Sequence, residues 1–557
     1  MSAQEDALQS AAQQAGEVFS RKASGMTRVV SPLTALAYSF VAPNITQASF
    51  YLLWAVTLYA GAQMQISILF MLTLIPFAAI YTYFSSAMPR SGGEYIYISR
   101  VLHPFLGFIA SWTLTIVGLN WQANNTNFVV NWGFGHAITQ MGLINKSQAM
   151  TNLGLELART QGSWLVWIVG TISLMLSFYV IYLGTKVFMR FVWGAVILTW
   201  IMLAVYAGVL LSVNPDVVHK GMMLVQNIDY QTVFAKAKEL GWTPGFISIA
   251  ATVAAGLTFM NLTCLGSTYS ANIAGEIKRV DKAQPLAQYG SIILFIIYYQ
   301  IFTYVTYHGF GKDLMEAISM LNAKGEDVPI FGSFPQTPFL LVYATQNPIL
   351  LLIGGPLAWG LINWVGAMGL AFAPVRNLFA YAFDGMLPDK LNEVNRRGSP
   401  VYAVLLGFFI SWLQFTVNVM TPLLSAYQVY TITIWFFGWI FLSIAAMAFP
   451  YRRKDIWEKA PEITRQSFMN IPWIVIAGAA GLIISLLTVY FTIVPALNPP
   501  SENYGWPGLA VSFGFYMLLP VVLYFVAVAV NKRRGTAFKD DSRKFHPIST
   551  CLAFRNL

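Results

Sequence analysis

The chain has 557 residues, of which 57% are hydrophobic and only 10% carry a charged side chain. A soluble domain of ordinary composition carries about 25% charged residues, so the composition excludes a purely water-soluble globular protein. The net charge of +10 would also suit nucleic-acid binding. We expect no nucleic-acid partner, because the basic residues gather in the loops between apolar segments, as they do on the cytoplasmic side of membrane proteins.

Twelve apolar segments are each long enough to cross a bilayer as a helix, which takes roughly 20 mostly apolar residues. The expected spans are Pro32–Ala60, Ser67–Ala87, Pro104–Trp132, Trp164–Leu183, Phe188–Val213, Phe246–Ala274, Ala287–Gly309, Pro348–Phe383, Val401–Met420, Leu423–Pro450, Pro472–Val494 and Trp506–Val530. The sequence therefore predicts an all-α integral membrane protein. We expect one transmembrane domain at 28–531, between tails at 1–27 and 532–557.

Lysine and arginine are divided unevenly between the two sides of the predicted bundle. If the N-terminus is cytoplasmic, 26 of the 33 basic residues lie on the cytoplasmic side. The positive-inside rule then predicts that both termini are cytoplasmic, and we expect the cell membrane as the location. Residues 1–26 lack the apolar core of a secretory signal peptide, so the first span should direct insertion. Three long outer segments, Gly133–Ser163, Asn214–Gly245 and Phe310–Asn347, are expected to hold short surface helices.

Ionisable side chains are almost absent from the middle of the expected spans, which argues against a proton relay of acids or histidines inside them. Of the two cysteines, Cys264 lies within a span and Cys551 in the polar tail, and no disulfide or redox role is expected. We expect no cofactor and no metal. The spans also lack the nucleophile–base cluster of an intramembrane enzyme and the charge ring or filter loop of a channel.

Two of the spans are interrupted. The first contains Ala42-Pro43-Asn44 near its middle, and proline removes a backbone donor and disfavours helix before it. The sixth has a polar, small-residue patch from Asn261 to Thr268. A simple proline kink and a close helix contact are the alternatives. Broken apolar segments in corresponding positions of two halves are, however, typical of the binding site of a transporter.

The third span carries several amides. Asn120, Asn124, Asn127 and Asn131 are spaced so that they share one face of a helix. Amides facing lipid would be costly, so we expect this face to meet a neighbouring helix or a cavity. An interhelical amide network and a ligand-facing strip remain equally open.

Three stretches carry a resemblance to a known family. Met88–Tyr97 resembles the P-x-x-G-G-x-Y-x-Y signature of the amino acid–polyamine–organocation (APC) superfamily. Gly266 with Glu276–Lys278 resembles its sixth-helix pattern, and Arg376–Pro388 with Ser399-Pro400 resembles its loop after the eighth helix. The resemblance covers nearly the whole chain. It implies a LeuT-like 5+5 inverted repeat plus two C-terminal helices, and alternating access to a substrate held between the first and sixth helices.

The resemblance also implies site residues. Carried over by position, with one amide added from the third span, the substrate-binding residues would be Val41, Ala42, Pro43, Asn44, Ile45, Thr46, Leu262, Thr263, Cys264, Leu265, Gly266, Ser267, Thr268 and Asn124.

Five charged residues lie at the predicted cytoplasmic ends of the second, third, sixth and eighth spans: Arg90, Glu94, Glu276, Arg376 and Asp384. Opposite charges brought together there would form an inner gate that closes the cytoplasmic side. The alternative is that each contacts water and lipid headgroups independently.

The sequence thus predicts a secondary transporter of amino acids, with a neutral substrate favoured because the spans hold so little charge. A polyamine or organic-cation transporter of the same fold is the alternative. The coupling ion is left open between H+ and Na+. In the fifth helix of some relatives a lysine replaces a sodium ion, but the matching residue here is Thr199. Sodium-coupled relatives use eighth-helix hydroxyls, whereas 349–383 contains no Ser or Thr.

The uneven charge distribution makes a testable prediction about topology. A cysteine placed in the loop Phe310–Asn347 should react with an impermeant thiol reagent in intact cells, whereas Cys551 in the tail should react only after permeabilisation. Labelling of Cys551 in sealed cells would contradict the predicted orientation.

Overall fold

The computed structural model describes residues 26–43, 61–159, 161–245, 247–324, 326, 341–347, 349–350, 353–421, 430–497 and 506–533. Within these residues, eleven helices are long and apolar enough to cross a membrane. The expected first span is described only to Pro43, where α2 (Pro32–Val41) has just ended. The protein is therefore an all-α integral membrane protein. The expected boundaries of the two tails lie largely outside the described residues and stay predictions.

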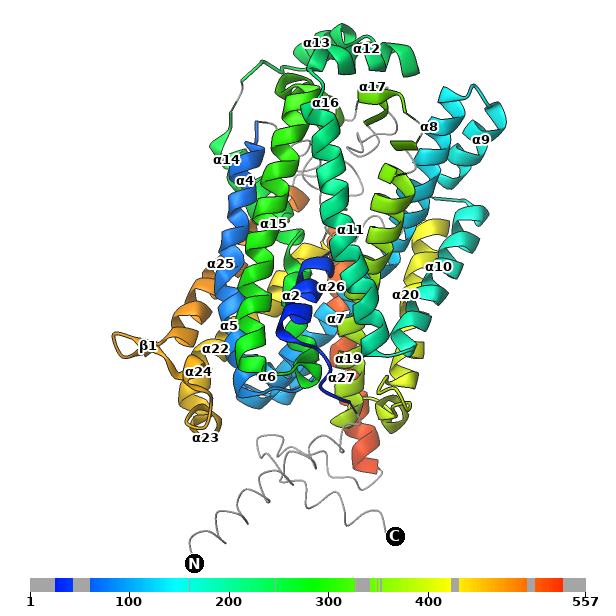
Figure 1. Ribbon diagram of the computed structural model, residues 1–557. Helices are drawn as coiled ribbons and strands as arrows, with labels where there is room; N and C mark the ends of the chain where they lie inside the picture. Colours follow the sequence, from blue (N-terminus) through cyan, green and yellow to red (C-terminus); the bar gives the residue numbers. More distant parts are fainter. Residues whose placement is uncertain are drawn as a thin grey trace, which may run out of the picture.

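The long helices stand side by side and form a bundle (Figure 1). Irregular helical turns continue several of them, so that one span is built from two or three consecutive elements. The membrane-spanning elements are α4 (Met64–Leu69), η1 (Phe70–Leu74) and α5 (Ile75–Ala87); α7 (Pro104–Phe128), η2 (Val129–Gly135) and α8 (His136–Ile144); α10 (Trp164–Tyr182); α11 (Thr185–Leu211); α14 (Ile249–Ala255), η3 (Gly256–Met260) and η4 (Leu265–Glu276); α15 (Val280–Phe310); η5 (Ile353–Ile362) and α19 (Asn363–Phe383); α20 (Val401–Met420); α22 (Thr431–Arg452); α25 (Trp473–Leu497); and α26 (Trp506–Phe513), η7 (Gly514–Leu518) and α27 (Leu519–Arg533).

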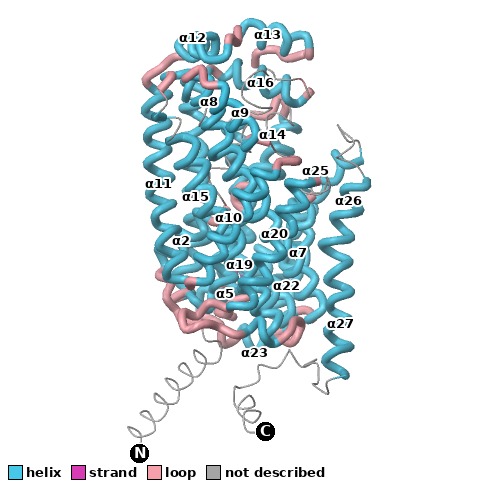
Figure 2. The backbone as a smooth tube through the Cα atoms, turned by 90° about the vertical axis from the view of Figure 1, so that its right-hand side faces the viewer, coloured by secondary structure: helices cyan, strands magenta, loops and turns pink. Residues whose placement is uncertain are grey.

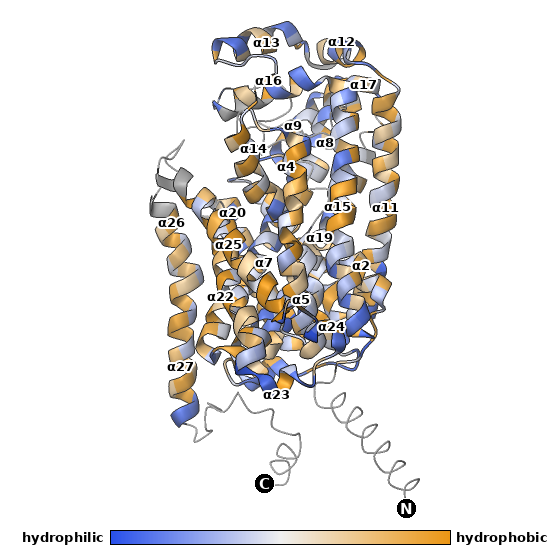
Figure 3. Cartoon of the chain, turned by 90° about the vertical axis from the view of Figure 1, so that its left-hand side faces the viewer, coloured by the Kyte–Doolittle hydropathy of each residue, from blue (hydrophilic) through white to orange (hydrophobic). Residues whose placement is uncertain are grey.

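Short elements cover the two ends of the bundle. One end carries the expected surface helices: α9 (Gln148–Leu157), α12 (Pro215–Gln226), α13 (Tyr230–Glu239), α16 (Lys312–Ala323) and α17 (Leu341–Thr345). The opposite end, which we call the inner end, carries α6 (Gly93–Val101), η6 (Asp389–Asn392), α23 (Lys454–Trp457), α24 (Glu462–Arg465) and the hairpin β1 (Ser467–Phe468) with β2 (Ile471–Pro472). Loops gather at these ends (Figure 2), and so do hydrophilic residues (Figure 3).

Burial separates central helices from peripheral ones. In the apolar stretches of α7–η2–α8 and of η5–α19, 89% of the residues are buried within the protein, against 22% in the last span. The short helix α2 packs against α15, α11 and η4, and η4 also packs against α19. The helix α2 and the irregular segment η4 therefore lie together inside the bundle, where neighbouring helices surround them.

The third span differs from the expectation. It was expected to end at Trp132, with a loop from Gly133, but the helical path continues through η2 and α8 to Ile144. The glycines serve close packing instead of ending the helix. A Cβ atom on Gly133 would lie 2.8 Å from Cα of Gly360, and one on Gly135 would lie 2.6 Å from the backbone nitrogen of Ala158.

Candidate functional site

The sixth span departs from regular α-helix over most of its inner half. The π-helical turn η3 leads through two α-helical residues at 261–262 into a turn at 263–264. The element η4 then continues for 12 residues as 3-10 helix, with a non-helical residue at Ile273. Runs of 3-10 helix longer than three or four residues are uncommon, and π turns are frequent at functional sites. The interruption that the sequence indicates in this span is therefore present, and it is longer than the polar patch.

The end of α2, where the sequence predicts the break in the first span, touches the break in the sixth span. A Cβ atom on Gly266 would lie 2.9 Å from the nitrogen of Pro43 and 3.1 Å from the carbonyl carbon of Ala42. On the other side, a Cβ on Gly369 of α19 would lie 2.9 Å from Cα of Ala42. The Tyr38 hydroxyl of α2 donates to the Gly369 carbonyl at 3.1 Å. The end of α2 is thus held between η4 and α19 by backbone contact, which only glycine permits.

The expected binding residues are only partly described. Asn44, Ile45 and Thr46 lie outside the described residues. The remaining members of the two breaks are buried apart from Pro43 and Leu262, which are half-buried: Val41, Ala42, Thr263, Cys264, Leu265, Gly266, Ser267 and Thr268.

The two threonine hydroxyls within the sixth-span break bond to their own helix. Thr263 donates to the Met260 carbonyl at 2.7 Å, and Thr268 to the Leu265 carbonyl at 3.0 Å. The Cys264 thiol faces the Met71 sulfur at 3.4 Å. The polar groups that this segment can offer to a ligand are therefore mainly backbone N–H and C=O groups.

Asn124 bonds away from both breaks, because its side-chain oxygen accepts a hydrogen bond from Asn418 of α20 at 3.3 Å. This contact favours the interhelical alternative for the amide face of the third span. Asn120 is also buried, and its side-chain oxygen has no hydrogen-bond partner among the described residues.

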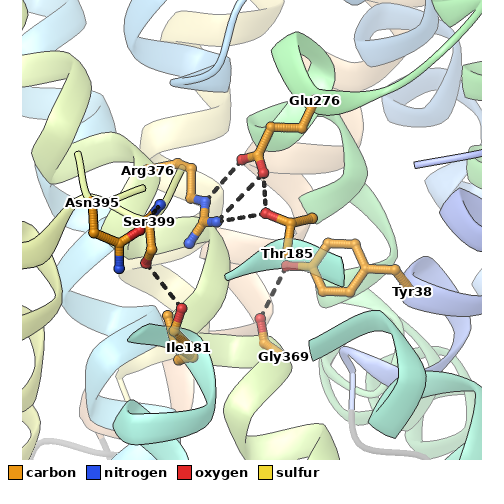
Figure 4. A network of polar contacts seen from close by, with 8 residues as sticks. All are labelled: Tyr38, Ile181, Thr185, Glu276, Gly369, Arg376, Asn395 and Ser399. Carbon is orange, nitrogen blue, oxygen red and sulfur yellow. Dashed lines mark hydrogen bonds and ion pairs between the residues drawn. The ribbon is translucent and has the colours of Figure 1, made fainter. Parts of the chain in front are cut away.

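A buried ion pair joins the sixth and eighth spans near the inner end (Figure 4). Nε of Arg376 donates to Glu276 at 2.9 Å, and the exposed fractions of the two side chains are 0% and 2%. The Thr185 hydroxyl of α11 donates to the Glu276 carboxylate and accepts from Arg376 at 3.1 Å. The guanidinium also lies 3.6 Å from the centroid of the Phe372 ring, which adds a cation–π contact.

Three backbone hydrogen bonds tie the end of η4 to the chain before α2. The N–H groups of Val29 and Val30 both donate to the Glu276 carbonyl, at 2.9 and 3.0 Å. Lys278 donates back to the Val30 carbonyl at 2.9 Å. The segment that enters the first helix is therefore fixed to the end of the sixth.

The other expected gate residues do not join that pair. Asp384 forms an ion pair with Arg100 at 2.8 Å, and Arg100 was not among the expected residues. Glu94 is buried and bonds to the Tyr81 hydroxyl and to Asn272 at 3.0 Å. Arg90 has its pKa lowered, first by burial and then by the charge of Arg100. The five residues thus lie in separate clusters rather than in one network.

Glutamines on α15 support the irregular backbone of η4, and the sequence analysis did not single them out. Gln284 donates to the Ser270 carbonyl at 3.0 Å, and Gln288 to the Thr268 carbonyl at 3.4 Å. Their spacing of four residues, one helical turn, is the signal that could have identified them.

Comparison with known proteins identifies the family to which the chain belongs. The sequence model of the family described as "Amino acid permease" matches residues 23–523, so the chain belongs to that family. It is similar to the branched-chain amino acid permease BcaP of Lactococcus lactis, with 22% identity over 394 residues, 68% of this chain and 75% of that protein. It also shares 22% identity over 352 residues with an uncharacterized transporter of Legionella pneumophila, 63% of this chain and 66% of that one. The chain is a membrane transporter rather than an enzyme.

The contact between the two breaks predicts an effect of side-chain volume. Gly266→Ala would force Pro43 or η4 to move, at a cost of about 1–3 kcal/mol as in other overpacked sites, and Gly266→Leu would do more. For Gly266→Leu we expect uptake to fall by at least about tenfold, while the protein is still expressed. Gly194→Leu is the matched control, because nothing lies within 4 Å of a Cβ there. Equal uptake by both variants would contradict a site at this contact.

The burial of Glu276 and Arg376 predicts a large effect on stability. Glu276→Gln leaves Arg376 buried without its counter-charge, which typically costs about 3–5 kcal/mol. The exposed pair of Lys236 and Glu326, at 2.7 Å, is the control, since Glu326→Gln should cost only about 0–1 kcal/mol. Thermal unfolding in detergent measures the loss of stability in both variants. If Glu276→Gln loses no more stability than Glu326→Gln, the prediction is wrong.

Proposed function

We propose that this protein is a secondary active transporter that moves neutral amino acids across the cell membrane by alternating access. The observation that carries the proposal is the contact of Gly266 with Ala42 and Pro43. It brings the end of α2, where the sequence predicts the break in the first span, against the non-α backbone of the sixth span. An amino acid has an amino group and a carboxylate, and broken helices offer carbonyls to the first and N–H groups to the second.

The preference for a neutral side chain rests on the charges near the breaks. The buried charges of Glu276 and Arg376 neutralise each other, which leaves them unsuited to hold a charged ligand group. Tyr269 of η4 and Trp435 of α22 lie with ring centroids 5.7 Å apart. Their hydroxyl and indole N–H have no partner in the described part of the chain. Such rings suit an apolar or aromatic side chain, and the name of the Lactococcus relative supports the same choice.

Alternating access is supported by the arrangement at the inner end. The Glu276–Arg376 pair and the Val29 and Val30 bonds close the bundle below the breaks. Each of these contacts joins two spans that the mechanism would move apart. In this reading the five expected gate residues act from separate clusters, and the buried pair contributes most of the closing interaction.

Reconstituted protein tests the proposal directly. Liposomes preloaded with unlabelled L-leucine should exchange it for labelled L-leucine by counterflow, with saturation, and branched-chain or aromatic amino acids should compete better than putrescine or arginine. The Gly266→Leu variant should show no exchange. Preferential competition by putrescine would favour the organic-cation alternative, and a non-saturating ohmic current would favour a channel. Failure of every amino acid to exchange in the unmodified protein would refute the proposed function.

A further inference from the structure

A buried carboxyl group lies outside the substrate breaks and outside the Glu276–Arg376 pair. Glu94 is in the first turn of α6, and 1% of it is exposed. In the part of the chain that the structure describes, none of the ion pairs includes it. A buried carboxylate without a counter-charge is costly, and such a group tends to take up a proton instead.

The immediate partners of Glu94 are neutral hydrogen-bond donors. The Tyr81 hydroxyl of α5 donates to one carboxyl oxygen, and Nδ2 of Asn272 donates to the other at 3.0 Å. Trp439 of α22 donates in turn to the Tyr81 oxygen at 2.9 Å. These groups partly stabilise a charged carboxylate, yet they also accommodate the neutral acid, so both protonation states of Glu94 are compatible with the site.

The paired glycines at the start of α6, the N-cap Gly92 and the first helical residue Gly93, bring Asn272 to this place. Gly92 has φ of +117° and Gly93 has φ of +40°, and a Cβ atom on Gly93 would lie 2.6 Å from Oδ1 of Asn272. The N–H of Gly92 donates to the Asn272 carbonyl at 2.9 Å. Oδ1 of Asn272 has no donor among the described residues. An unpaired acceptor therefore lies close to the turn that carries Glu94.

Hydrogen bonds connect this site to the moving parts of the proposed transporter. Asn272 belongs to η4, the segment that contacts Pro43 through Gly266, and its Nδ2 also donates to Asn377 of α19 at 3.1 Å. Asn377 donates to Thr115 of α7 at 2.9 Å. A change of charge at Glu94 therefore acts directly on Asn272 of the sixth span. Through Asn272 it also acts on Asn377 of the eighth span.

The titratable groups that face Glu94 are tyrosines. They are Tyr81 on α5, Tyr97 on α6, Tyr269 on η4 and Tyr381 on α19. Burial raises the pKa of Glu94 above its ordinary value, against the opposing effect of the bonds from Tyr81 and Asn272. The charged groups at the same end of the bundle, Arg90, Arg100 and Asp384, interact with one another.

We propose that the Glu94 carboxyl is a proton-binding site that couples amino acid transport to a proton gradient, an inference that rests on the transport function proposed above. The carboxylate binds one proton from the solution on the side to which the site is open and releases it on the other side. With the proton bound, the carboxyl is a weaker acceptor for Asn272. The bond that holds η4 to α6 weakens, and the preference between inward and outward states changes.

Two assays on the same proteoliposomes separate coupling from transport. Counterflow at equal pH on both sides needs no proton gradient, whereas accumulation against a leucine gradient does. For the unmodified protein, an acid exterior should drive accumulation by up to about tenfold per pH unit, if one proton moves with each substrate. Glu94→Gln should retain counterflow, lose this accumulation and become insensitive to pH.

Three variants complete the design. Tyr81→Phe keeps the carboxyl but removes a bond that lowers its pKa, so the pH profile of transport should move to higher pH while coupling remains. Glu94→Asp should restore part of the accumulation. Glu316→Gln, a half-buried carboxyl on α16 paired with Lys312 at 3.5 Å, is the control and should accumulate leucine normally.

Several results would overturn the inference. The first is that the Glu94→Gln variant still accumulates leucine when a proton gradient is applied. The second is counterflow without proton-driven accumulation in the unmodified protein, although the transporter assignment would then stand. If Glu94→Gln loses counterflow as well, infrared difference spectra decide. A protonated carboxyl band that titrates and is absent from the variant supports the site, and an unchanged spectrum rejects it.

Discussion

The backbone of η4 sets the constraint on which the rest of this bundle depends. Inside a membrane each backbone polar group needs a partner within the protein, so non-α backbone is tolerated only where other protein groups surround it. Besides the Glu276 carbonyl, which accepts from Val29 and Val30, four carbonyls of η4 receive donors from α15, from α6 and from the turn before α6. Gln288 and Gln284 of α15 bond to those of Thr268 and Ser270, Tyr97 to that of Ala271, and Gly92 to that of Asn272. The irregular segment persists because α15 and α6 supply these groups.

The charged groups near the inner end are also surrounded by protein, so each of them needs partners within the protein. Glu276 and Arg376 are buried but carry opposite charges, and Thr185 bonds to both. These contacts offset much of the free-energy cost of burying the two charges. Among the described residues, the side chains that bond to the Glu94 carboxyl are neutral donors. In the proposed mechanism, the first arrangement stabilises one closed state, and the second supplies a carboxyl that binds and releases a proton. This difference separates a structural contact from a candidate coupling group.

The sequence indicated most of the fold, for a physical reason. A span must be long and apolar, so Val401–Met420 was predicted with the bounds that the structure shows. Prediction was poorer where glycine or proline occurs inside a helix. Gly133 suggested a loop but packs against Gly360 within a continuing span, and α15 begins at Val280 although Pro285 lies within it. Whether such residues end a helix depends on the neighbouring helix, which the local sequence does not contain.

For the site, the sequence by itself determined that the sixth span is interrupted and which charges lie at the ends of spans, because runs of small polar residues and the rarity of charge in apolar segments are local properties. The break that it predicts after Pro43 in the first span lies outside the described residues. Only the tertiary structure decided the partners. In the folded protein, Glu276 pairs with Arg376, which is 100 residues away in the sequence. Asp384 forms its ion pair with Arg100, and Asn272 lies beside Glu94. Pairing depends on which helix faces meet, and that is fixed by packing of the whole bundle rather than by any one segment.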